Sequence, residues 1–252
     1  MASRALRALA TLGFTALVAA SLTGCATGSL VDAGSNPDEI DDGENTEQIM
    51  VEAAWIDGGR MIGIVTEGSS TCVPTAGDVT LEKDGVLAVT LEEPSDDTPC
   101  TMDYVPRVTP VQLPDGVDPS KDLAIAVTGA GYDGSVDLAG VEGLTVDGPS
   151  DMTPSAGWTN VNGTFVVLLW GSSTCPEYIT STEVTADAAV TASLSGIPAD
   201  KACTADMAPN AVLAYADGLS GVPDVELTLT STMADDVVIP ILGVNDPTVP
   251  LG

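Results

Sequence analysis

The stretch Gly68-Ser69-Ser70-Thr71-Cys72 recurs 103 residues later as Gly171-Ser172-Ser173-Thr174-Cys175, and this repetition decides how the chain is organised. A second motif returns at the same offset, because Cys100-Thr101-x-Asp103-x-x-Pro106 is followed by Cys203-Thr204-x-Asp206-x-x-Pro209. Trp55 and Trp158 add a third match. Chance does not produce such agreement, so we interpret the chain as two copies of one unit.

The period of the repeat is long enough for a domain. Solenoid units run roughly 20 to 45 residues and need stacked neighbours, whereas this period is 103 residues. The offset changes only in the closing segment, where residues 123–128 match residues 225–230 at an offset of 102. This difference predicts that one loop before the segment is one residue shorter in the second copy. We therefore expect a first β domain at 49–130, a linker at 131–154 and a second β domain at 155–252.

Short apolar runs separated by turn residues predict an all-β fold. Val, Thr, Ile and Leu alternate with Gly, Pro, Asp and Asn, and Asp57-Gly58, Asp84-Gly85 and Asn162-Gly163 are strong hairpin signals. We expect two tandem small antiparallel β-sandwich or barrel-like domains of six strands each. In the first copy the predicted strands cover residues 50–56, 61–66, 79–83, 86–92, 104–113 and 123–128. The alternation at 136–146 can add a strand, and the apolar tail at 237–252 is expected to pack on the second domain.

The four cysteines of the repeats permit three disulfide pairings. Two units with one fold must each close internally, which selects Cys72 with Cys100 and Cys175 with Cys203. Each bond closes a loop of 28 residues, and such a loop adds about 3 to 4 kcal/mol by restricting the unfolded chain. Small cores with few aromatic residues usually need this covalent help.

The fifth cysteine ends an N-terminal targeting segment. Arg4 and Arg7 precede an apolar run, which is followed by Leu22-Thr23-Gly24-Cys25. This motif resembles the lipobox of bacterial lipoproteins, and the tandem repeats are similar to those of bacterial surface lipoproteins. The resemblance implies removal of residues 1–24, a diacylglycerol thioether on Cys25, and an added acyl chain such as palmitate. Residues 25–48 are acidic and polar and predict a flexible tether.

These features predict a protein anchored by lipid to the extracytoplasmic face of the cell membrane; the alternative is an ordinary secreted protein. The chain has 7 basic and 37 acidic residues and a net charge of −30. The negative electrostatic potential of this charge repels nucleic acid, so we expect no nucleic-acid partner. It favours cationic partners, although an acidic surface can also serve solubility alone.

Catalytic constellations are absent from the sequence. The chain has no histidine, which excludes Ser-His-Asp and Cys-His systems, and no thiolate remains once the disulfides form. Carboxylate pairs are uninformative among 37 acidic residues. We expect no cofactor beyond a structural calcium ion near residues 92–97 or 115–118.

The repeated residues are the candidate ligand-facing groups: Trp55, Trp158, Ser69, Ser70, Ser172 and Ser173. The competing interpretation is structural, in which the hydroxyls, Asp103 and Asp206 bond to the backbone around each disulfide and the tryptophans fill cores.

The function that we expect is a binding or interaction module for an extracytoplasmic protein, glycan or cationic ligand. The alternatives are an envelope-structural spacer and a carbohydrate-active or other hydrolytic enzyme. A binding module requires a cleft where Trp or hydroxyl groups converge, in each unit or between them, and a spacer has none. An enzyme of the third kind requires two carboxylates about 5 to 10 Å apart across a groove.

Overall fold

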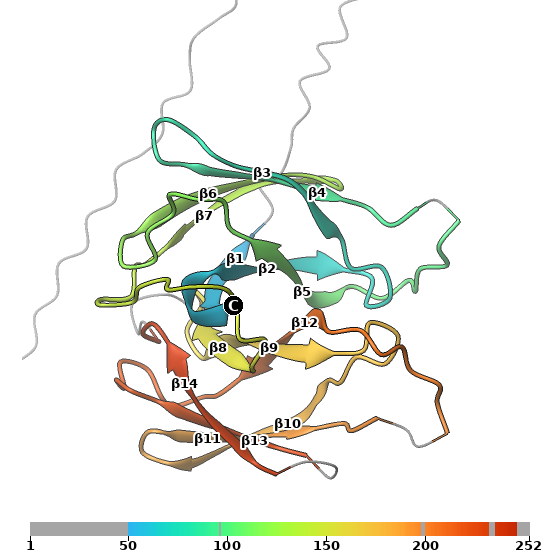
Figure 1. Ribbon diagram of the computed structural model, residues 1–252, viewed down its shortest axis with the longest axis vertical. Helices are drawn as coiled ribbons and strands as arrows, with labels where there is room; N and C mark the ends of the chain where they lie inside the picture. Colours follow the sequence, from blue (N-terminus) through green and yellow to red (C-terminus); the bar gives the residue numbers. More distant parts are fainter. Residues whose placement is uncertain (1–49, 96, 198–199, 232–234, 246–252) are drawn as a thin grey trace, which may run out of the picture. The chain divides into compact units, whose positions relative to one another are not determined.

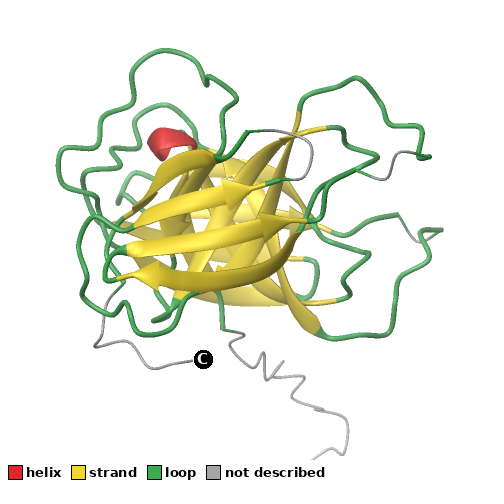
Figure 2. Ribbon diagram, turned by 90° about the horizontal axis from the view of Figure 1, so that it is seen from below, coloured by secondary structure: helices red, strands yellow, loops and turns green. Residues whose placement is uncertain are grey.

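The computed structural model describes residues 50–95, 97–197, 200–231 and 235–245, and these residues form fourteen β-strands and one short 3-10 turn (Figure 2). The all-β prediction is therefore confirmed. The predicted signal segment, the tether and Cys25 lie outside the described residues. No helix among the described residues is long and apolar enough to cross a lipid bilayer.

The first repeat is a sandwich of two sheets (Figure 1). One sheet has three strands in the order β1-β2-β5, namely β1 (Glu52–Ile56), β2 (Met61–Gly68) and β5 (Val105–Gln112), and the turn η1 (Asp57–Gly59) joins the first two. The other has four strands in the order β3-β4-β6-β7, namely β3 (Thr75–Leu81), β4 (Leu87–Glu92), β6 (Leu123–Gly129) and β7 (Tyr132–Leu138).

The second repeat uses the same seven strands. They are β8 (Ser155–Trp158), β9 (Thr164–Gly171), β10 (Ile179–Ala186), β11 (Ala189–Leu194), β12 (Ala208–Tyr215), β13 (Glu226–Thr230) and β14 (Val237–Leu242). Here β14 also pairs in parallel with β8, with Ile241 opposite Ala156, so all seven strands join in one sheet. In both repeats most pairs are antiparallel, but β4–β6 and β11–β13 are parallel.

The seventh strand corrects the predicted count of six. The predicted linker at 131–154 begins with β7, which pairs with β6 and places Val136 opposite Ile125. The apolar tail packs on the second repeat as expected, and it does so as β14, with Ile239 opposite Leu227. Both strands carry apolar side chains on the face that completes the sandwich, and this burial recruits segments that we had placed outside the repeated unit.

The predicted one-residue slip is confirmed by strand register. Leu87 lies opposite Ile125 in the first repeat, and Val190 lies opposite Leu227 in the second. Val190 follows Leu87 by 103 residues, whereas Leu227 follows Ile125 by 102. The loop between β12 and β13 is therefore one residue shorter than its counterpart, while the pairing is conserved.

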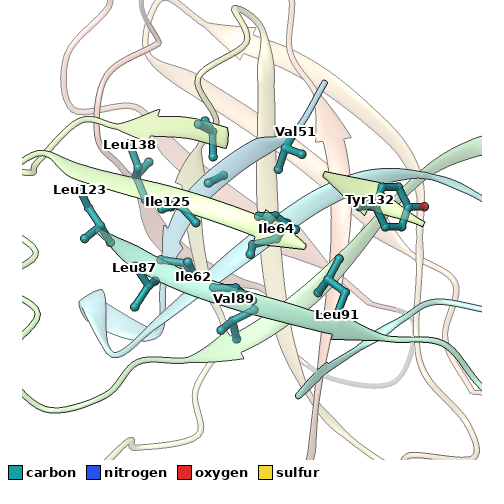
Figure 3. Packing of buried hydrophobic residues seen from close by; sticks show 14 of the residues in the cluster. Val51, Ile62, Ile64, Leu87, Val89, Leu91, Leu123, Ile125, Tyr132 and Leu138 are labelled. Carbon is teal, nitrogen blue, oxygen red and sulfur yellow. The ribbon is translucent and has the colours of Figure 1, made fainter. Parts of the chain in front are cut away.

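The core of the first repeat lies between its two sheets. Alternate residues of β4 are buried, as a strand with one face on the core requires. Leu87, Val89 and Leu91 meet Ile62 and Ile64 of the facing sheet (Figure 3). The second repeat has a matching core that is built around Phe165, Val167 and Leu227.

A third core joins the repeats. β2 and β9 are buried on both faces, because one set of their side chains fills its own sandwich and the other set meets the opposite repeat. The shared cluster contains Ala54, Ile56, Met61, Val65, Val108, Val166 and Leu168. The three-stranded faces β1-β2-β5 and β8-β9-β12 therefore form the inner layers of one folded unit.

Both disulfides are present as predicted. Cys72 is bonded to Cys100 and Cys175 to Cys203, with Cα–Cα distances of 5.4 and 5.6 Å. Each bond ties the loop after β2 or β9 to the loop before β5 or β12. Both of these loops project from the end of the sheets that lies to the right in Figure 1.

Candidate functional site

The repeated Gly-Ser-Ser-Thr-Cys motif builds a hydrogen-bond network around the first disulfide. The Ser70 N–H donates to Asp103 Oδ1 at 3.2 Å, and the Thr101 N–H donates to Thr71 Oγ1 at 2.9 Å. The hydroxyls of Ser69 and Thr101 lie 2.9 Å apart, and the Thr101 hydroxyl also donates to Asp103. The polar groups of the motif are thus used within the two loops that the disulfide joins.

The second repeat reproduces this network. The Ser173 N–H donates to Asp206 Oδ1 at 3.2 Å, and the Thr204 N–H donates to Thr174 Oγ1 at 3.0 Å. The Ser172 hydroxyl lies 2.8 Å from that of Thr204. In each copy the hydrogen bonds lower the pKa of the aspartate to about 2, with the serine side chain as the largest cause. The structural interpretation of Ser69, Ser70, Ser172 and Ser173 accounts for their contacts.

The first disulfide loop has an additional support from Arg107. Its guanidinium donates to the carbonyls of Ser69 and Cys72 at 2.8 and 2.6 Å, and to the Tyr132 hydroxyl at 2.7 Å. Gly68 admits this side chain, because a Cβ at position 68 would stand 2.6 Å from the Arg107 Cζ atom. Arg107 is therefore a structural cation.

The repeated tryptophans are core residues, which corrects their candidate ligand-facing role. Trp55 and Trp158 are only 1% and 3% exposed. The Trp55 indole N–H donates to the Ala139 carbonyl at 2.8 Å, and Trp158 packs edge-on against Phe165 with ring centroids 5.2 Å apart. Burial of these large rings inside each sandwich leaves no face for a ligand.

The third tryptophan, Trp170, lines a cleft between the repeats that we did not predict. It is half-buried at the end of β9, where the first repeat carries Glu67. The cleft has a volume of about 490 Å³ and is formed by both repeats: Met61, Pro74, Thr75, Ala76, Thr109, Pro110, Gln112, Trp170 and Pro209. This volume lies within the range of ligand pockets, roughly 300 to 1,000 Å³.

The chemistry of the cleft is mainly apolar. Pro74, Pro110 and Pro209 line the cleft together with Met61 and Trp170. The polar side chains on its wall are few and partly used: Thr109 donates to the Pro74 carbonyl at 2.9 Å, and Gln112 donates to the Arg60 carbonyl at 3.0 Å. The Trp170 indole N–H is buried and has no hydrogen-bond partner in the described part of the chain.

The repeat-related counterpart of this cleft is acidic. Tyr215 occupies the position of Gln112, and its pKa is raised by burial and then by Glu52 and Glu67. Glu52 is half-buried, and burial raises its pKa, although Thr159 donates a hydrogen bond of 2.7 Å to its carboxylate. Glu67 raises the Glu52 pKa further. The two sides of the repeat interface therefore differ in charge.

Of the two acidic segments predicted for calcium, residues 115–118 contain local contacts, whereas Asp96 of residues 92–97 lies outside the described residues. Asp118 accepts hydrogen bonds from Ser120 and an ion pair of 2.7 Å from Lys121, and Lys121 is the main cause that lowers the Asp118 pKa to about 2. Across the described ranges no three Asp, Glu, Cys or His side chains cluster as a metal site would require.

Comparisons with known proteins return no match: no family model, no curated protein and no solved structure is similar to this chain.

Proposed function

We propose that the protein is a lipid-anchored extracytoplasmic binding module whose ligand occupies the cleft between the two repeats. The observation that carries the proposal is the cleft itself, which is lined by Trp170 of one repeat and by Met61 and Pro110 of the other. A cleft formed between the units is what a binding module requires and a spacer lacks. The anchor at Cys25 follows from the lipobox resemblance.

The composition of the wall favours a protein segment over a glycan. Sugars need many hydrogen-bonding side chains, whereas this cleft is lined by proline rings, a thioether and an indole whose N–H has no partner among the described residues. An extended segment with apolar side chains fits such a surface, and its backbone carbonyl supplies an acceptor for Trp170. The partner that we propose is an exposed apolar segment of another extracytoplasmic protein.

Site-directed photocrosslinking in intact cells tests the proposal. A photoreactive residue at Thr75, which is exposed on the cleft wall, should capture one protein, and Trp170→Ala should abolish that capture. The same photoreactive residue at Asp84, in the outer hairpin between β3 and β4, is the matched control. Capture that is equal at both positions, or that survives Trp170→Ala, would contradict the cleft as the binding site.

The two alternatives have their own outcomes in this experiment. A spacer predicts that no protein is captured from the Thr75 position in cells grown under varied conditions. A glycan ligand predicts that the bound material resists protease and is removed by glycosidases. The acidic side of the repeat interface, with Glu52 and Glu67, brings two carboxylates near each other, and Trp170→Ala would leave a hydrolytic activity located there unchanged.

A further inference from the structure

A second cavity lies in the first repeat and adjoins the cleft at Gln112, which lines both. It is lined by the η1 turn, the loop after β5 and the segment that follows β7, and its volume is about 370 Å³. Asp57 and Arg60 stand on its wall with Asp115 and Ser150. Its size falls within the range of small-molecule pockets.

Asp57 is a buried carboxylate that forms no ion pair with a described residue. The residue is only 6% exposed, its Oδ1 accepts one hydrogen bond of 2.8 Å from the Ser150 hydroxyl, and its Oδ2 has no partner among the residues that the structure describes. Within the described ranges the ion pair that exists is Lys121 with Asp118. A buried charge without a counter-charge is costly, so this position calls for a cationic group from outside the chain.

Arg60 is a cation on the same cavity wall that contacts no carboxylate in the described part of the chain. Its guanidinium donates to the carbonyls of Asp57, Asp147 and Gly148, which holds the group rigidly, and none of these acceptors is a carboxylate. Arginine has five N–H donors, and these three hydrogen bonds leave two for a ligand. The cavity wall therefore carries a fixed negative and a fixed positive group that are not paired with each other.

The repeat symmetry is broken at this position. The counterpart of Asp57 is Asn160, whose amide oxygen accepts the N–H of Ala53 across the repeat interface at 3.0 Å. By the repeat symmetry, Asp57 would accept a hydrogen bond from the N–H of Ala156, the counterpart of Ala53. Ala156 instead lies opposite Ile241 of β14. Asp57 instead adopts a left-handed backbone with φ of 51°. Strain of this kind concentrates at ligand sites.

We infer that this cavity binds a small zwitterion of the α-amino-acid class. The ammonium group meets the Asp57 carboxylate, and the carboxylate group meets the free N–H donors of Arg60. A bare metal ion fits less well, because the Arg60 guanidinium repels it. The inference concerns a different site from the cleft and does not depend on the ligand proposed there.

Calorimetry and thermal shift on the full chain in detergent micelles test the inference. We expect at least one of the twenty amino acids, added at up to about 10 mM, to bind with a Kd of about 1 mM and to raise the melting temperature. Its methyl ester and its N-acetyl derivative, which each lack one charge, should bind at least about tenfold more weakly. Calcium chloride alone should give no shift.

Asp57→Asn is the decisive variant, because Asn matches the natural residue at the equivalent position 160. It should weaken binding about tenfold or more, while its unfolding transition without ligand stays cooperative. Asp84→Asn, outside the cavity, is the matched control and should bind as the wild type does. The inference is overturned if no amino acid binds, if Asp57→Asn binds equally well, or if calcium alone reproduces the stabilisation.

Discussion

Gly63 lies against Val166, the residue that holds the same position in the second repeat. A Cβ on Gly63 would stand 2.9 Å from Val166 Cγ1 and 3.0 Å from Val108 Cγ1. Contact between a residue and its own counterpart places both near a two-fold axis that relates the repeats. An interface of this kind uses the same patch from both partners, as in a symmetric dimer.

Other contacts across the interface follow the same reciprocity. Ala54 forms a β-bridge with Thr159, the counterpart of Ile56, and Gly157, the counterpart of Ala54, approaches the backbone of Trp55. The two repeats are thus packed as a dimer within one chain. The predicted arrangement of domains joined by a linker did not include this shared core.

Gly157→Ala should destabilise the protein by about 1 to 3 kcal/mol, the usual cost of overpacking. A Cβ at position 157 would lie 2.0 Å from the Trp55 carbonyl oxygen, which is backbone and cannot rotate away. Denaturant unfolding followed by tryptophan fluorescence measures the effect. Gly171→Ala is the matched control, since its Cβ would enter open space, and a loss as large at 171 as at 157 would show that the close approach is not the cause.

Glu52→Gln should stabilise the protein at pH 7. Burial raises the pKa of Glu52 in the folded state above its ordinary value, so its contribution to stability is full below pH 4.5 and is lost as pH rises through the folded pKa. Gln removes the charge and keeps an acceptor for the Thr159 hydroxyl, which donates to Glu52 at 2.7 Å. Melting temperatures measured from pH 4 to 8 should differ between Glu52→Gln and the wild type only near neutral pH.

Asp103→Asn combined with Asp206→Asn should remove part of the acid sensitivity. Hydrogen bonds from serine and threonine lower the pKa of both aspartates to about 2 in the folded state. Their stabilisation is therefore present above pH 3.8 and is lost as pH falls through about 2. The double variant should be less stable than the wild type at pH 7 and should show a flatter stability profile between pH 4 and 2.

The control for this double variant is Asp187→Asn, in the exposed turn between β10 and β11. It should reproduce the wild-type profile in acid. An acid profile of the double variant that overlies the wild type would mean that these hydrogen bonds do not stabilise the fold.

The parts of the fold that sequence predicted are those where the repeats agree. Identical residues around the cysteines determined the disulfides, and the role of Asp103 in accepting the Ser70 N–H followed from the chemistry of the motif. The alternation at 136–146 and the apolar tail pointed to these segments, but they were not recognised as one repeated strand because Val136 and Ile239 share only apolar character. The matches of Gly140 with Gly243 and of Val141 with Val244 at an offset of 103 were the available signal.

The candidate sites lie where the repeats differ. Trp170 stands opposite Glu67 in the alignment, and Asp57 stands opposite Asn160. The predicted ligand-facing groups are residues shared by both copies, and shared residues serve the common fold. The burial of β2 and β9 on both faces could also have been predicted from the sequence. Unbroken apolar runs such as Phe-Val-Val-Leu-Leu-Trp at 165–170 are typical of strands covered on both faces.

Cys25→Ala should release the protein from the membrane. The lipobox resemblance assigns the acyl chains to this cysteine, and two or three chains bind a bilayer far more strongly than one, at roughly 0.8 kcal/mol for each buried methylene. The net charge of −30 supplies no attraction to anionic lipids. Cell fractionation and a high-salt wash of the membranes measure the effect, with Cys72→Ala combined with Cys100→Ala as a control that removes two cysteines and leaves the anchor. A Cys25→Ala variant that stays with washed membranes would show that anchoring does not depend on this residue.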